Sequence, residues 1–219
     1  MKTLGILGGM GPAATVAFLA RVQALTPASC DEDHIRVIAD INSQVPNRHT
    51  QPQAAAAELG RMAAALGVAG AQVLAMPCNT AHAHADAIRA AGLPFIDMIA
   101  ATADAAAAAG AKAVGILATP GGEALYRSAL AARGLKPVGL DEAGRAAFMA
   151  AVFAVKAGDA GAGQRAAMRH LAEQLVAAGA DHLIAGCTEV PLLLDAGEAP
   201  VPLTDSAEIL AAACVAACR

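Results

Sequence analysis

Two cysteines, Cys78 and Cys187, each follow a short apolar run and precede hydroxyl or amide side chains. The apolar runs, residues 72–76 and 182–185, have the length and composition of buried strands. Parallel sheets carry their working residues at the carboxyl ends of their strands. The sequence therefore predicts two thiols at the positions where α/β proteins perform chemistry.

The spacing of these cysteines indicates an internal repeat. A Gly-Ile-Leu segment at 5–7 recurs at 115–117, and the distance from Gly5 to Cys78 is 73 positions against 72 from Gly115 to Cys187. Self-similarity over so long a period is a signal at the level of the fold. It predicts two similar α/β domains related by a pseudo-twofold axis, with an active site in the cleft between them.

The order of elements supports a parallel sheet in each half, because strands alternate with helices. We expect an N-terminal domain over residues 1–98 and a C-terminal domain over 99–205, with a closing helix over 206–219 that packs back on the first domain. The expected strands are 3–7, 35–41, 72–76, 93–96, 112–118, 136–140, 182–185 and 200–203. The expected helices are 13–25, 53–66, 81–91, 98–109, 123–132, 142–157, 163–178 and 206–218.

Composition excludes several classes of function. The chain has 219 residues, a net charge of −4 and 16% charged residues without a basic block, so nucleic acid and acidic membrane surfaces are poor partners. The most apolar region, 99–117, is interrupted by Asp104 and Lys112 and is too weak for a membrane span. The first residues show no signal peptide, and the five cysteines lack disulfide-like spacing. These features predict a cytoplasmic protein.

Two thiols in one cleft suit acid–base chemistry at carbon. A thiolate is a strong base with an ordinary pKa of roughly 8.5, which a nearby helix N-terminus or cation lowers. Both cysteines precede predicted helical segments, and neither has an obvious histidine partner with a third orienting group. If one thiol removes a proton and the other returns one to the opposite face, a stereocentre is inverted without a cofactor. For either cysteine alone, a buried structural thiol is the alternative.

The other cysteines and His82 give weaker evidence of a functional role. Cys30, Cys214 and Cys218 are interpreted as structural or incidental, and no metal-ligand spacing is evident. His82 follows Cys78 by four positions, so it could face the same cleft, although a role in helix packing is the preferred interpretation.

Four motifs together resemble the aspartate/glutamate racemase family, and most closely its aspartate racemase branch. They are Gly-Ile-Leu-Gly-Gly-Met-Gly-Pro at 5–12, Pro46 with Arg48, Pro-Cys-Asn-Thr-Ala-His at 77–82, and Gly-Cys-Thr-Glu at 186–189. The resemblance covers nearly the whole chain. It implies a cofactor-independent amino-acid racemase, an isomerase that does not use pyridoxal phosphate, with two α/β domains and commonly a homodimeric assembly.

The resemblance also assigns roles to individual residues. It implies that Cys78 and Cys187 are the catalytic thiols, and that Arg48 and Lys156 lie near the side-chain carboxylate of an acidic substrate. The groups implied for the α-carboxylate and amino group are Asn79, Thr80 and Thr188. Further residues of the matching motifs complete the candidate substrate site: Met10, Thr119 and Glu189.

Departures from the family pattern leave the preferred amino acid open. Gly122 stands where relatives usually carry a threonine, Asn47 where an acid is frequent, and Glu189 where the glutamate racemases proper place a histidine. Diacid isomerases and malonate decarboxylases of the wider superfamily are alternatives, although a decarboxylase needs only one thiol. From other classes, residues 9–14 with Asp40 fit a dinucleotide fingerprint, and a non-catalytic carboxylate-binding protein is a third possibility.

Overall fold

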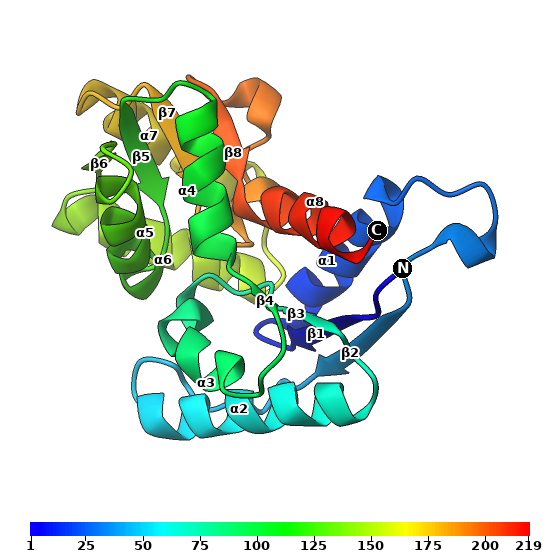
Figure 1. Cartoon of the computed structure of the whole chain (residues 1–219). Coiled ribbons are helices and arrows are strands. Elements are labelled where there is room, and N and C mark those ends of the chain that lie inside the picture. The colour runs from blue at the N-terminus through cyan, green and yellow to red at the C-terminus, as the bar shows by residue number, and fades with distance from the viewer. The chain divides into compact units, whose positions relative to one another are not determined.

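The computed structural model describes all residues, 1–219, and contains two four-stranded parallel sheets flanked by helices (Figure 1). The strand orders are β2-β1-β3-β4 and β6-β5-β7-β8, so the second sheet repeats the order of the first. This confirms the predicted α/β class. The strands are β1 Leu4–Gly8, β2 Val37–Ile41, β3 Val73–Ala75, β4 Phe95–Ile96, β5 Ala113–Leu117, β6 Lys136–Val138, β7 His182–Ala185 and β8 Leu203–Asp205.

Eight α-helices and four short 3₁₀ segments connect the strands. The α-helices are α1 Pro12–Leu25, α2 Pro52–Val68, α3 Ala85–Arg89, α4 Met98–Ala108, α5 Pro120–Ala131, α6 Glu142–Lys156, α7 Ala162–Ala177 and α8 Ser206–Cys218. The 3₁₀ segments are η1 Asp31–Asp33, η2 Thr80–His84, η3 Val190–Leu192 and η4 Ala196–Glu198. None of the helices combines the length and apolar composition that a membrane crossing needs.

The chain forms two compact units. Unit 1 comprises residues 1–101 and 207–219, and unit 2 comprises residues 102–206. The domain limits given above, at 98/99 and 205/206, stay predictions.

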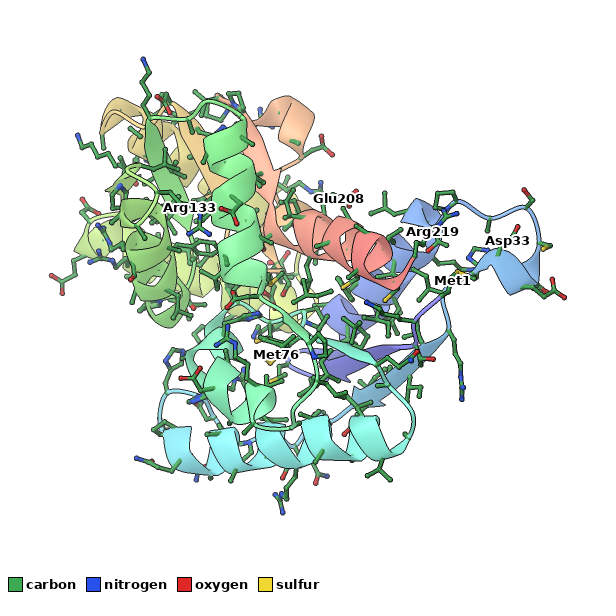
Figure 2. All side chains as sticks on the ribbon, viewed as in Figure 1. Met1, Asp33, Met76, Arg133, Glu208 and Arg219 are labelled. Carbon is green, nitrogen blue, oxygen red and sulfur yellow. The ribbon has the colours of Figure 1, made fainter.

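The two central strands of the unit 1 sheet, β1 and β3, are buried throughout. Because successive side chains of a strand point to opposite sides, both faces of the sheet pack against helices here. Leu4 and Ile6 of β1 belong to a buried cluster with residues of α1 and α8, whereas Leu7 belongs to a second cluster with residues of α2. Figure 1 shows α2 on one face of this sheet and α1 with α8 on the other. Met76, labelled in Figure 2, follows β3 and is completely buried. The strand that leads to Cys78 is therefore fixed from both sides.

Unit 2 has one large cluster, built between its sheet and two consecutive helices. Phe148 and Val152 of α6 pack with Met168 and Leu171 of α7 and with Leu183 of β7. The cluster also contains Cys187, so this thiol lies at the border of a close-packed core.

A glycine in the first strand of each unit leaves room for a leucine of the neighbouring strand and for the helix packed over it. A Cβ on Gly5 would lie 2.8 Å from Leu74 Cδ2, and a Cβ on Gly115 would lie 2.6 Å from Leu183 Cδ2. Leu74 and Leu183 are separated by 109 positions. The other neighbours of the two glycines are related by the same 109 positions: Leu66 to Leu175 and Ala71 to Ala180. The repeat thus extends from the motif to its packing environment.

We expect Gly115→Ala to lower the free energy of unfolding by about 1–3 kcal/mol, because the added methyl overpacks a filled core. The methyl would meet Leu175 Cβ at 3.0 Å in addition to Leu183. Gly163→Ala is the matched control, because no atom lies within 4 Å of its added Cβ. Since Gly163 lies in the first turn of α7, where the propensity gain is smaller than in a helix interior, Gly163→Ala should leave the stability nearly unchanged or raise it slightly. Urea unfolding of the three proteins measures both effects, and equal stabilities would contradict the packing interpretation.

Cys214 and Cys218 lie on α8 and are buried in the core of unit 1. No disulfide is present. Burial, with a smaller contribution from Cys218, raises the pKa of the Cys214 thiol. Burial also raises the pKa of Cys218. Both residues are therefore core thiols, as the sequence predicts.

Ionisation of Cys214 makes stability depend on pH. Above roughly pH 8.5 the unfolded chain loses this proton while the folded chain keeps it, so the unfolding free energy falls as pH rises, by at most about 1.4 kcal/mol per pH unit. We expect Cys214→Ala to show a shallower decline than the parent in urea titrations between about pH 8 and pH 10. Val215→Ala, a change of core volume on the same helix, should keep the parental slope; identical slopes for all three proteins would refute this.

Candidate active site

Cys78 lies in a tight turn at the carboxyl end of β3. Its amide donates to the Met76 carbonyl at 2.8 Å, and its carbonyl accepts from His82 Nδ1 at 2.9 Å. The residue is 6% exposed and belongs to the same buried cluster as Met10 and Val45. The glycine turn after β1 and the loop after β2 therefore contribute to the packing of the strand end that carries the first thiol.

His82 holds this turn. Its Nε2 accepts the Met98 amide at 3.1 Å while Nδ1 contacts the Cys78 carbonyl, so the network assigns the proton to Nδ1. Burial lowers the pKa of His82, against smaller raising effects of the Cys78 carbonyl and Asp97. A neutral ring with both nitrogens engaged in the interior agrees with the packing interpretation of His82.

The segments after the two thiols differ from the expected helices. Residues 80–84 form a 3₁₀ helix before α3, whereas an α-helix over 81–91 was predicted. The Cys78 carbonyl, which an α-helix would offer to the His82 amide, accepts from the His82 ring instead, and the amide bonds to Asn79. After Cys187 the corresponding carbonyl accepts the Val190 amide at 3.0 Å, because the residue four positions on is Pro191, which has no N–H to donate. Neither thiol thus precedes a long α-helix.

The loop after β2 presents Arg48. Asn47 Oδ1 accepts the amides of His49 at 2.9 Å and Thr50 at 3.1 Å, which shapes a local turn around the arginine. Arg48 Nε is buried and has no hydrogen-bond partner. A buried donor without an acceptor is costly. The arginine is therefore suited to an anion that completes its hydrogen bonds.

The second thiol, Cys187, follows β7 and is hydrogen-bonded to a carboxylate. Cys187 Sγ donates to Glu189 Oε2 at 2.9 Å, and Thr188 Oγ1 donates to the same oxygen at 3.2 Å. Lys156 Nζ at the end of α6 lies 3.6 Å from Glu189 Oε1. Four of the predicted site residues of unit 2 are thus brought together.

Burial is the main influence on the pKa of Cys187. Desolvation raises this pKa well above the ordinary value, and the Glu189 carboxylate raises it further through charge and hydrogen bonding. The Glu189 backbone amide and, to a smaller extent, Lys156 act in the opposite direction. A raised pKa favours the protonated thiol, in agreement with the hydrogen bond that Cys187 donates to Glu189.

Thr119 caps the helix that follows β5. Its side chain accepts the Gly122 amide at 3.3 Å, and Pro120 occupies the first turn. Helix α5 accordingly begins at Pro120, three residues before the predicted start. A Cβ on Gly122 would lie 3.3 Å from Ala118 Cβ, so the threonine of the relatives would be tight here.

The predicted site residues form equivalent pairs across the repeat. Cys78 and Cys187 are separated by 109 positions, the separation that also relates the glycine environments. Three further pairs share it: Met10 with Thr119, Asn79 with Thr188, and Thr80 with Glu189. The sequence does not predict that Glu189 contacts a thiol. The equivalent position in the first half is Thr80, so Glu189 marks a site where the two halves differ in charge.

The chain contains no group of three or more His, Cys, Asp or Glu side chains placed to hold a metal ion. The groups described above are thiols, hydroxyls, amides, one guanidinium and one lysine–glutamate pair.

Comparisons with known proteins agree with this architecture. The model of the Asp/Glu/hydantoin racemase family matches residues 7–214. The chain is 27% identical to the broad specificity amino-acid racemase RacX of Bacillus subtilis (strain 168) over 219 residues, 95% of this chain and 94% of RacX. The aspartate racemase of Picrophilus torridus is 27% identical with a TM-score of 0.84, covering 100% of this chain and 94% of that one. A Yersinia pestis protein assigned provisionally as an Asp/Glu racemase is 30% identical with a TM-score of 0.87, covering 100% and 99%.

The fold and these relationships define an isomerase of the racemase class. The chain belongs to the Asp/Glu/hydantoin racemase family, whose model matches almost its whole length. The family predicted from the four motifs is thereby confirmed.

Proposed function

We propose that the chain racemises an acidic amino acid, most closely aspartate, without a cofactor and with Cys78 and Cys187 as the two bases. The observation that carries this proposal is the repeat itself: each unit ends its third strand on a buried thiol at an equivalent position, followed by a polar amide or hydroxyl residue. A pair of equivalent acid–base groups is what inversion at a carbon requires.

In the proposed reaction one cysteine is a thiolate and the other a thiol. The thiolate removes the α-proton, and the negative charge that develops spreads onto the α-carboxylate. Asn79, Thr80 and Thr188 stabilise this charge together with backbone amides. The opposite thiol then delivers its proton to the other face of the carbon.

The surroundings of Arg48 are the evidence that the substrate has an acidic side chain. Its buried Nε lacks a protein acceptor, and a guanidinium matches a carboxylate in shape and charge. Lys156 is proposed to act near the same end of the substrate, and Met10 and Thr119 to line it. The 27% identity to a broad specificity racemase favours broad amino-acid specificity as the second candidate.

Proton exchange in D₂O tests the proposal. Proton NMR follows the loss of the α-signal of L-aspartate, L-glutamate and several neutral L-amino acids, and chiral chromatography follows the D-enantiomer. We expect exchange and D-product with aspartate. Equal rates with neutral amino acids would favour the broad specificity racemase, and no exchange with any amino acid would refute both.

The homodimer and the cytoplasmic location belong to the proposal as well. Light scattering coupled to size exclusion measures the assembly, and a monomeric mass would contradict the dimer.

A further inference from the structure

The two proposed catalytic thiols have different chemical surroundings. The position two residues after Cys78 is Thr80, whereas the equivalent position after Cys187 is Glu189. Only the second position carries a carboxylate, and this carboxylate accepts the Cys187 thiol proton at a distance of 2.9 Å. The two equivalent thiols are therefore followed, two positions on, by residues of different charge.

The Glu189 carboxylate is held against the thiol. Its side chain is 8% exposed, against 45% for Lys156. Thr188 Oγ1 donates to the oxygen that accepts from Cys187, while Lys156 approaches the other oxygen. Because the carboxylate is buried and the lysine is largely solvated, the negative charge is the less screened of the two charges near the sulfur.

We propose that Glu189 is a positioning residue that holds Cys187 as a protonated thiol in the resting enzyme. This inference rests on the two-thiol racemisation proposed above. It makes Cys187 the proton donor of the first half-reaction. The resting enzyme then accepts first the enantiomer whose α-hydrogen faces Cys78.

The protons balance over one turnover. The Cys78 thiolate takes the α-proton as the C–H bond breaks, and the Cys187 S–H bond breaks as its proton forms the new C–H bond. Cys78 is left as a thiol and Cys187 as a thiolate beside the Glu189 carboxylate. Water then returns a proton to Cys187 and accepts one from Cys78, which restores the resting form.

The pKa of Cys187 reflects burial, Glu189 and Lys156. Desolvation is the largest cause of the raised pKa and the Glu189 carboxylate adds to it, whereas the Glu189 backbone amide and, less strongly, the Lys156 ammonium lower it. Loss of the Glu189 charge should lower the pKa of Cys187, and loss of the Lys156 charge should raise it.

Thiolate absorbance in the ultraviolet tests the proposal without any substrate. The contribution of Cys187 is the difference between a protein and its Cys187→Ser variant, titrated from about pH 7 to about pH 11. Wild type should show no Cys187 step near the ordinary pKa of a thiol, because burial and the Glu189 carboxylate raise the pKa of Cys187. In Glu189→Gln, which keeps the shape and removes the charge, the Cys187 step should move to a lower pH than in wild type. Lys156→Met is the control, because loss of the ammonium should raise the pKa of Cys187 instead of lowering it. This variant should therefore show no Cys187 step in the titrated range.

Circular dichroism establishes that each variant is folded. Glu189→Thr, which installs the residue of unit 1 at the equivalent position, replaces Glu189→Gln if the latter fails to fold. Titration of wild-type Cys187 near roughly pH 8.5 would overturn the proposal, and so would identical Cys187 titrations in wild type and the folded Glu189 variant. Since no turnover is measured, these outcomes are separate from a failure of racemase activity.

Discussion

Cys187→Ser is expected to reduce racemisation by about 10²–10⁴-fold, the usual contribution of a positioned acid or base. The variant keeps one thiol, Cys78, which can still remove and return a proton on its own face of the substrate. We therefore expect α-proton exchange in D₂O without inversion, and for one enantiomer only. Cys78→Ser should exchange the opposite enantiomer more slowly, because the remaining thiol, Cys187, donates a hydrogen bond to Glu189 and burial raises its pKa. Proton NMR with chiral chromatography measures both reactions.

Cys30→Ser is the matched control for these variants, because Cys30 is an exposed cysteine outside the proposed site. It should racemise at the parental rate. A single variant of Cys78 or Cys187 that keeps full racemisation would disprove the two-base mechanism, and exchange of both enantiomers by one variant would place both proton transfers on the remaining thiol.

Arg48→Ala is expected to raise the KM for aspartate by about 10- to 10²-fold, the value of hydrogen bonds to a charged group. The physical reason is the buried Nε, which has no acceptor in the protein and which the substrate carboxylate would supply. A neutral amino acid lacks this carboxylate, so its KM should change little. Steady-state kinetics with aspartate and alanine measure the contrast.

Arg36→Ala is the matched control, because Arg36 is an exposed arginine of the same unit. It should leave both KM values unchanged. Equal effects of Arg48→Ala on aspartate and alanine would argue against a role at the side-chain carboxylate, and would agree with broad amino-acid specificity.

The pattern of the sequence predicts the topology well because the repeat constrains it. Gly5 and Gly115 open equivalent strands, and the spacing to the two cysteines implies equal strand orders, which the sheets have. Pattern alone places the last strand wrongly. It predicts a strand at 200–203, whereas β8 lies at 203–205, because Pro200 and Pro202 have no amide to donate to a ladder.

Side-chain contacts were less predictable than topology. Nothing in the spacing of Glu189 shows that its carboxylate turns toward the Cys187 sulfur, because this depends on rotamers within a packed loop. The short 3₁₀ segment after Cys78 depends likewise on the His82 ring taking a backbone carbonyl. Local competition between side chain and backbone for one acceptor is not visible in periodicity.

The position of α8 has a consequence for the synthesis of the protein. The helix lies in the core of unit 1, where Leu210 and Cys214 pack with Leu4 and Phe18, and the Lys2 amide donates to the Cys218 carbonyl at 2.7 Å. Its residues leave the ribosome after the whole of unit 2 has been made. The unit that begins first is thus completed last, and the nascent N-terminal half waits with an open apolar face until translation has passed residue 218.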